Sequence, residues 1–117
     1  HAHKYESKNK YIDIVGIMKY TGEEYCEDSQ NFEIKIFENS IPVEIDFFER
    51  KIIFCNEGVW TGIKIKSFEE TMELIKKDIE KIRYDKKFEI IKNNKVVGAV
   101  KIIKIVNEKI IKYKNKE

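Results

Sequence analysis

Apolar and polar residues alternate along most of this 117-residue chain, which is the pattern of half-buried β-strands. The alternation covers residues 11–18, 32–37, 43–47, 59–66 and 96–106, with a shorter apolar segment at 88–91. The run Lys51–Cys55 predicts a further strand and places Cys55 among buried residues. Because β-branched side chains suit a pleated sheet, the 21 isoleucines against a single leucine favour strands further.

Short polar segments between these stretches predict turns. The turns are expected at Thr21-Gly22, Glu38-Asn39-Ser40, Asn56-Glu57-Gly58 and Lys92-Asn93-Asn94-Lys95. The last of them predicts a tight hairpin, since asparagine tolerates a positive φ angle. Within the strand that follows, Gly98 and Ala99 indicate a β-bulge or a close approach of two backbones.

The period changes between Ser67 and Arg83, where a single apolar stripe at helical spacing predicts one amphipathic helix. The stripe consists of Phe68, Met72, Ile75, Ile79 and Ile82. Ser67 and Glu70 have the spacing of a capping box, so the helix is expected to begin there. The lysine-rich tail over residues 108–117 is expected to be a short helix or a frayed end.

These elements predict one mainly β domain, a small antiparallel Greek-key barrel of about six strands with the helix 67–83 inserted. The alternative is an α+β sheet with the same helix packed on one side. No Gly-, Pro- or Ser-rich linker divides residues 1–117. The chain begins His1-Ala2-His3 without a methionine, so residues 1–9 are expected to be a tag remnant or a disordered arm.

The charge composition does not indicate a nucleic-acid-binding protein. The 23 basic and 21 acidic residues leave a net charge of +2, and only Arg50 and Arg83 are arginines. Guanine and phosphate recognition favours the bidentate arginine side chain, which this chain almost lacks. No signal peptide and no long apolar run is present in the sequence, so a cytoplasmic protein without membrane contact is expected.

The sequence contains no constellation that is typical of a catalytic or metal site. Its two histidines both lie in the first three residues, and no Gly-x-Ser-x-Gly motif or phosphate-binding loop of the form Gly-x4-Gly-Lys-Ser/Thr occurs. Cys26 and Cys55 stand alone, without a neighbouring cysteine or histidine that would activate a thiol. We therefore expect no enzymatic activity, no cofactor and no bound metal.

The segment Lys87–Ile105 resembles the closing hairpin of the third, C-terminal β-barrel domain of elongation factor Tu-like translation factors. In that family an Arg-Phe-x-Ile strand and a glycine turn precede Arg-Thr-Val-Gly-Ala-Gly and an aliphatic strand. The matching positions in this chain are Phe88, Ile90, Val97, Gly98 and Ala99. The resemblance implies a standalone translation-factor-like barrel that contacts a protein or RNA of the translation apparatus, without GTP hydrolysis.

The resemblance covers about twenty residues, which is the extent of a single motif match, and two features depart from it. The acidic-glycine turn of the family is replaced here by Lys92-Asn93-Asn94, and the helix 67–83 has no counterpart in that strand-rich domain. The family turn lies close to the aminoacyl-tRNA. A basic turn at the same place would suit contact with phosphates.

Two segments are candidate partner-binding sites. The first is the basic hairpin turn, formed by Lys92, Asn93, Asn94 and Lys95, for RNA phosphates. The second is the acidic run, formed by Glu23, Glu24, Glu27 and Asp28, which suits a basic protein surface. The acidic run supports the alternative function of a small toxin-immunity or inhibitor protein. A protein partner is favoured over RNA, because arginines and stacking aromatic residues are scarce near the hairpin. A solvated loop is the simplest alternative for both segments.

Overall fold

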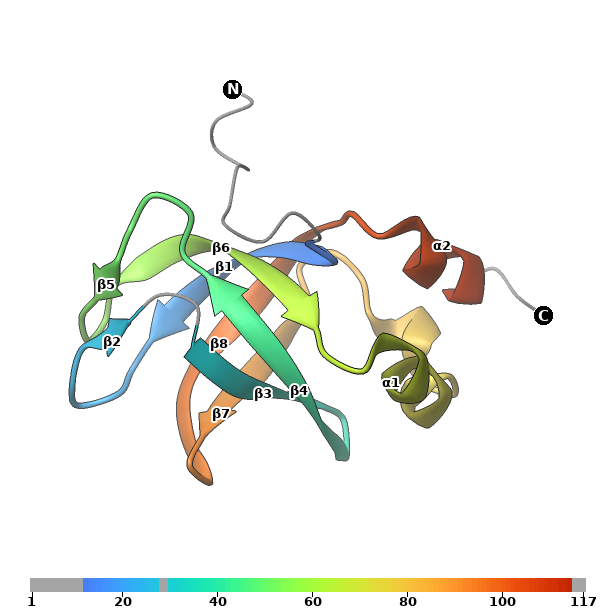
Figure 1. Cartoon of the computed structure of the whole chain (residues 1–117), viewed down its shortest axis with the longest axis horizontal. Helices are drawn as coiled ribbons and strands as arrows, with labels where there is room; N and C mark the ends of the chain where they lie inside the picture. The colour runs from blue at the N-terminus through green and yellow to red at the C-terminus, as the bar shows by residue number, and fades with distance from the viewer. Residues whose placement is uncertain (1–11, 28–29, 115–117) are drawn as a thin grey trace.

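The computed structural model describes residues 12–27 and 30–114 (Figure 1). The first half of the chain forms β1 (Ile14–Tyr20), β2 (Cys26–Glu27), β3 (Gln30–Ile36), β4 (Asn39–Asp46), β5 (Ile52–Ile53) and β6 (Gly58–Ile65). The second half forms α1 (Phe68–Ile75), the short 3-10 helix η2 (Ile79–Lys81), β7 (Lys87–Lys92), β8 (Lys95–Ile105) and α2 (Glu108–Lys114).

Six of these strands close into a barrel in the order β1-β6-β4-β3-β7-β8, and β8 pairs again with β1. Every neighbouring pair is antiparallel. The consecutive strands β3, β4 and β6 lie side by side and β1 returns beside β6, which is a Greek-key arrangement. The predicted mainly β barrel is therefore confirmed, and the alternative of an open α+β sheet is wrong.

Alternate side chains of each barrel strand point inward and fill the interior. They include Ile14 and Met18 of β1, Phe32 and Ile34 of β3, Val43 and Ile45 of β4, Ile63 of β6, Ile90 of β7, and Val100 and Ile102 of β8. All of these side chains are buried. The void that remains among them is about 10 Å³, which is at the lower limit of what one water molecule needs. This void therefore has no room for a ligand.

Gly98 allows β8 to pack closely against β1 where the barrel closes. It pairs with Tyr20, and a Cβ atom at this position would lie 2.5 Å from the carbonyl oxygen of Lys19. The β7–β8 register shifts next to Gly98, so that Val97 is the extra residue of a β-bulge. The sequence predicted a β-bulge or a close approach of two backbones at Gly98 and Ala99, and the structure contains both.

Asp13 links three strands at the start of β1. Its carboxylate accepts hydrogen bonds from the backbone N–H of Ile65 (2.6 Å) and from the side-chain amide of Asn107 (2.6 Å). Its backbone carbonyl accepts from Val106 and Asn107. Asp13 is buried, so these bonds satisfy a charged group that would otherwise be costly in the interior.

The helical segment is shorter than predicted. Instead of one helix over 67–83, α1 ends at Ile75 and a separate 3-10 turn follows. The apolar stripe is nevertheless used as expected, because Met72, Ile75, Ile79 and Ile82 are all buried. Of the two alternatives for the tail, the short helix is correct over Glu108–Lys114, which forms α2.

The predicted capping box does not form. Ser67 has left-handed backbone angles (φ 50°, ψ 57°) and its side chain makes no cap hydrogen bond. The reason is the tight junction before the helix: the backbone N–H of Lys66 still donates to Pro42 in the barrel, so the chain must reverse at Ser67. Such a reversal removes the extended backbone that a capping serine requires.

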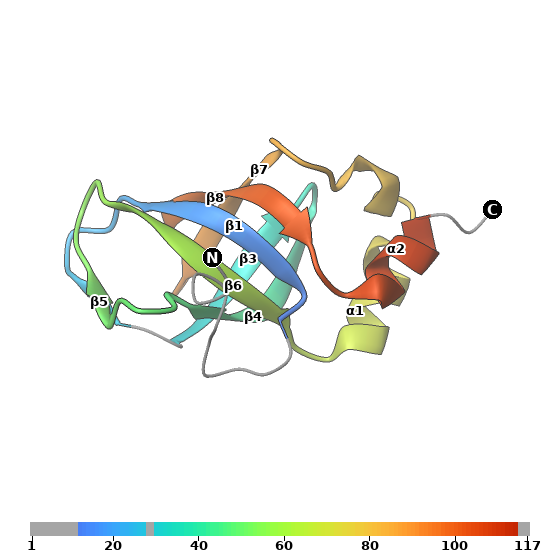
Figure 2. The same cartoon turned by 90° about the horizontal axis from the view of Figure 1, so that it is seen from above.

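The barrel has two distinct ends. At the helical end, α1 and α2 follow the last residues of β6 and β8 (Figure 1). At the opposite loop end, β1 leads into the small two-stranded sheet β2–β5, and β7 turns into β8 (Figure 2). In the described part of the chain, no helix is long and apolar enough to cross a membrane.

Candidate functional site

The acidic run lies on the connection that leaves β1 at the loop end. Glu23 and Glu24 are exposed in this connection, and Glu27 is exposed in β2. Asp28 lies outside the described residues. The described carboxylates therefore face solvent, as contact with a basic partner requires, but exposure alone also fits a solvated loop.

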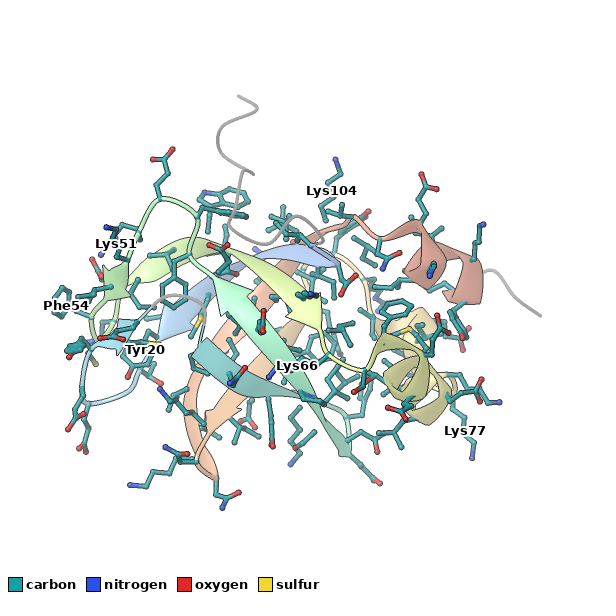
Figure 3. The ribbon with its side chains drawn as sticks, viewed as in Figure 1. Tyr20, Lys51, Phe54, Lys66, Lys77 and Lys104 are labelled. Atoms are coloured by element: carbon teal, nitrogen blue, oxygen red, sulfur yellow. The ribbon has the colours of Figure 1, made fainter. Side chains whose placement is uncertain are left out.

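The small sheet β2–β5 next to the acidic run carries two exposed aromatic residues. Cys26 pairs with Ile53 and Glu27 with Ile52, and Tyr25 and Phe54 directly adjoin the paired residues Cys26 and Ile53 in the sequence. The exposed fraction is 52% for Tyr25 and 57% for Phe54. Figure 3 shows Phe54 at the extremity of the loop end, pointing away from the barrel. The acidic run predicted part of this surface, and the exposure of Phe54 was missed.

Phe54 is exposed because a local turn interrupts the strand that was predicted over 51–55. The carboxylate of Glu57 accepts hydrogen bonds from the backbone N–H of Phe54 (2.8 Å) and from the guanidinium of Arg50 (2.8 Å). The hydrogen bond from Phe54, together with that from Arg50, lowers the pKa of Glu57 below its ordinary value of 4.5. Glu57 thus holds the 54–57 turn in place.

The same turn exposes Cys55, contrary to its predicted burial. Cys55 was predicted to be buried, but it is exposed, whereas Cys26 is buried. The prediction for Cys55 was wrong because β5 ends at Ile53 and the chain then turns at Asn56, which has a positive φ of 71°. Cys26 and Cys55 form no disulfide in the described part of the chain, and the thiol of Cys26 donates to the carbonyl oxygen of Glu27 (3.6 Å).

The predicted basic hairpin forms the turn between β7 and β8. Asn93 and Asn94 have φ angles of 53° and 65°, as the type I′ turn of a two-residue hairpin requires. Lys95 is exposed, whereas Lys92 is half-buried with its ammonium 5.5 Å from the ring centre of Phe32. The turn therefore presents two cations on a well-defined backbone.

The two candidate segments share one end of the barrel without forming a single site. Thr21 donates a backbone hydrogen bond to Val97, so the connection after β1 and the start of β8 lie side by side. Beyond this point the acidic connection continues into β2, and the hairpin extends as a separate projection (Figure 1). The structure thus places the acidic and basic segments on neighbouring but separate loops.

An open groove of about 570 Å³ lies at the helical end between α1 and the β3–β4 turn. Its lining combines Phe37 and Leu74 with the charged residues Glu38, Glu73, Lys76, Lys77, Asp78 and Lys81. Lys76 pairs with Glu73 and Lys81 with Asp78, which neutralises most of this charge. The groove was not predicted, because it depends on the break between α1 and η2.

Among the described residues, no three His, Cys, Asp or Glu side chains gather as metal ligands would. The buried carboxylates of Asp13 and Asp46 accept hydrogen bonds from the backbone N–H groups of Ile65 and Phe48, which is a structural role. Comparison with known protein families and with curated proteins finds no match to this chain.

Proposed function

We propose that the protein is a non-enzymatic binding module, a standalone barrel resembling those of translation factors, that contacts a protein or RNA of the translation apparatus in the cytoplasm. The observation that carries this proposal is the arrangement of the loop end, where both predicted contact segments extend from a closed and filled barrel. A filled barrel leaves its loops and outer surface as the places for recognition.

The β7–β8 turn is the element through which RNA would be bound. Its backbone is defined by two asparagines with positive φ, and lysines stand on both sides of them. Lysine contacts to phosphates contribute affinity without base specificity, and they release counterions. Each lysine that meets a phosphate should therefore contribute about one unit to the slope of log affinity against log salt concentration.

The test is the double variant Lys92→Gln/Lys95→Gln, measured by binding to bulk tRNA over a series of salt concentrations. We expect weaker binding and a slope that is flatter by about two units. The matched control is Lys77→Gln/Lys112→Gln, which removes two exposed lysines at the helical end and should leave the slope unchanged. The absence of salt-sensitive tRNA binding by the wild type, or equal flattening in the control, would overturn the RNA form of the proposal.

A second function is supported by the acidic run: a small inhibitor or immunity protein that covers a basic surface of another protein. The supporting observation is the exposure of Glu23, Glu24 and Glu27 beside the exposed aromatic residues of β2–β5. A genomic neighbour that encodes a toxin would favour this function. Direct inhibition of that toxin by the purified protein is the decisive measurement, and its failure would exclude this second function.

A further inference from the structure

We propose that the outward face of the β2–β5 sheet is a docking surface for a lysine- and arginine-rich face of a partner protein. We call the side chains of Tyr25 and Phe54 on this face the aromatic pair. The proposal rests on the second form of the function above and identifies the residues and partner chemistry that it would use. It does not involve the β7–β8 turn, so the two sites can be tested separately.

The strand register defines which side chains belong to this face. Residues alternate across a β-sheet, and Cys26 and Ile53, which pair with each other, are both buried. Their sequence neighbours Tyr25 and Phe54 are instead exposed, with exposed fractions of 52% and 57%. Within the described residues, β2 and β5 pair only with each other, so no third strand adjoins this sheet.

Exposed aromatic side chains on a small sheet are typical of the contact residues of protein interfaces. Aromatic residues are enriched at the interface positions that contribute most binding energy. Leu74 and Tyr84 are equally exposed at 56% and 57%, but Leu74 lies in α1 and Tyr84 in the turn before β7. The aromatic pair is distinguished by its position, because both residues adjoin the same strand pairing, that of Cys26 with Ile53.

The surrounding charges select the chemistry of the partner. Three exposed carboxylates lie close to Tyr25 in the sequence. Glu23 and Glu24 precede it in the connection after β1, and Glu27 follows it in β2. On the other side, Arg50 is bound to Glu57 and to the carbonyl oxygen of Ile52, which leaves Lys51 as the exposed cation of the β5 segment. An aromatic face bordered by carboxylates suits guanidinium and ammonium groups, through cation–π contacts and ion pairs.

The contact between Glu57 and the backbone of Phe54 also prepares this surface for binding. Because Glu57 and Arg50 fix the 54–57 turn, Phe54 does not have to be ordered when the partner arrives. Preorganisation of this kind reduces the entropic cost of association. Glu57 is therefore a positioning residue for the aromatic pair.

The experiment measures fluorescence anisotropy of labelled nona-arginine with the full chain, and labelled nona-glutamate serves as the opposite-charge probe. We expect the wild type to bind nona-arginine and not nona-glutamate. The variant Tyr25→Ala/Phe54→Ala should weaken nona-arginine binding by about 5- to 30-fold, the effect of losing two exposed cation–π contacts. The matched control Leu74→Ala/Tyr84→Ala removes two equally exposed side chains and should bind like the wild type.

A second pair of variants tests the charges. Glu23→Gln/Glu24→Gln should weaken nona-arginine binding, whereas Glu80→Gln/Glu108→Gln, at the helical end, should not. Bound nona-arginine should also slow the reaction of Cys55 with a maleimide, because this exposed thiol adjoins Phe54. Thermal melting verifies that all variants fold, which is expected since every altered side chain is exposed.

Equal binding by the wild type and the aromatic variant would overturn the proposal, as would the absence of nona-arginine binding. Dimerisation of the wild type that is lost in Phe54→Ala would assign the face to a second copy of the chain and would also overturn it. The Lys92→Gln/Lys95→Gln variant should keep its nona-arginine binding. Loss of tRNA binding in that variant therefore tests the hairpin, and loss of nona-arginine binding in the aromatic variant tests this face.

Discussion

Asp13 shows how one buried side chain connects elements that are distant in the sequence. Its carboxylate receives one hydrogen bond from Ile65 and another from Asn107. Replacement of Asp13 by alanine removes both bonds and leaves buried donors without a partner. We expect Asp13→Ala to lower the free energy of unfolding by about 2–4 kcal/mol, measured by urea denaturation.

The control for this variant is Glu80→Ala, since the Glu80 side chain is exposed and its backbone φ is not positive. Surface substitutions of this kind usually change stability by less than about 0.5 kcal/mol. Equal effects of the two variants would show that the hydrogen bonds of Asp13 do not stabilise the barrel.

Tyr20 gives the stability a dependence on alkaline pH. Burial, followed by the nearby Cys26 and Glu24, raises the pKa of Tyr20 above its ordinary value of 10.0. Between pH 10.0 and the raised pKa, the unfolded chain loses this proton while the folded chain keeps it. The free energy of unfolding therefore falls as the pH rises above about 10, the pKa of a tyrosine in the unfolded chain. Tyr20 has no such effect at neutral pH.

Tyr20→Phe should consequently show a smaller loss of melting temperature between about pH 9 and pH 11 than the wild type. The exposed Tyr84 supplies the control variant Tyr84→Phe, which should follow the wild-type curve. Thermal denaturation at several pH values gives the comparison. Parallel curves for all three proteins would assign the alkaline loss of stability to other groups, such as the lysines.

Residue-level predictions from sequence succeeded where the cause was local and failed where it was not. The positive φ angles of Asn93 and Asn94 follow from their own side chains and were predicted. The exposure of Cys55 depends on the turn at Asn56, whose backbone N–H donates to the carbonyl oxygen of Tyr20 in β1, and the role of Asp13 likewise depends on distant partners. For Asp13 these partners are 52 and 94 residues away, so no local pattern indicates them.

At the scale of elements, the helix illustrates the same division. The spacing of Met72, Ile75 and Ile79 identifies the buried face, because burial determines the apolar period. The same spacing cannot show that the helix stops at Ile75, since the stripe continues through η2. The backbone reversal at Ser67 could likewise not be predicted from the spacing, because it arises from the hydrogen bond that the backbone N–H of Lys66 donates to Pro42 in the barrel.

Gly98 controls the pairing of β8 with β1. A Cβ atom at Gly98 would collide with the backbone of Lys19, and backbone atoms of a closed barrel have little freedom to move. We expect Gly98→Ala to destabilise the protein by about 1–3 kcal/mol in urea denaturation. The control is Gly58→Ala on the other neighbour of β1, where the nearest atom would lie at 3.9 Å. Similar losses in both variants would contradict a specific role of the close approach.

For the whole molecule, the barrel could be predicted because every strand carries its own alternating pattern. The order of the strands and the candidate binding face could not be predicted in this way, because both depend on which segments pair. Tyr25 and Phe54 belong to separate segments, and they become one surface only through the pairing of Cys26 with Ile53. The acidic residues beside them were recognisable because a run of like charges is visible without any pairing.

The barrel and its helical end should differ in local stability. The helices contain eight, three and seven residues, which is too short for independent stability, so they depend on packing. Ile110 of α2 is buried, α2 packs against η2, and the ammonium of Lys114 donates to the carbonyl oxygen of Ile82 (2.9 Å). The barrel strands instead have hydrogen-bonded neighbours on both sides.

Ile110→Ala should therefore loosen the helical end while the barrel stays closed. The cavity left by this change costs about 2–4 kcal/mol, and we expect the amides of α2 and η2 to exchange with solvent at least about 30-fold faster. The exchange rates of the β1 and β8 amides should change much less, because the hydrogen bonds between these two strands do not involve α2. Ile111→Ala, which alters the more exposed neighbour, is the control. Native-state hydrogen exchange distinguishes the outcomes: equal acceleration in helices and strands would mean that the barrel and its helical end unfold as one unit.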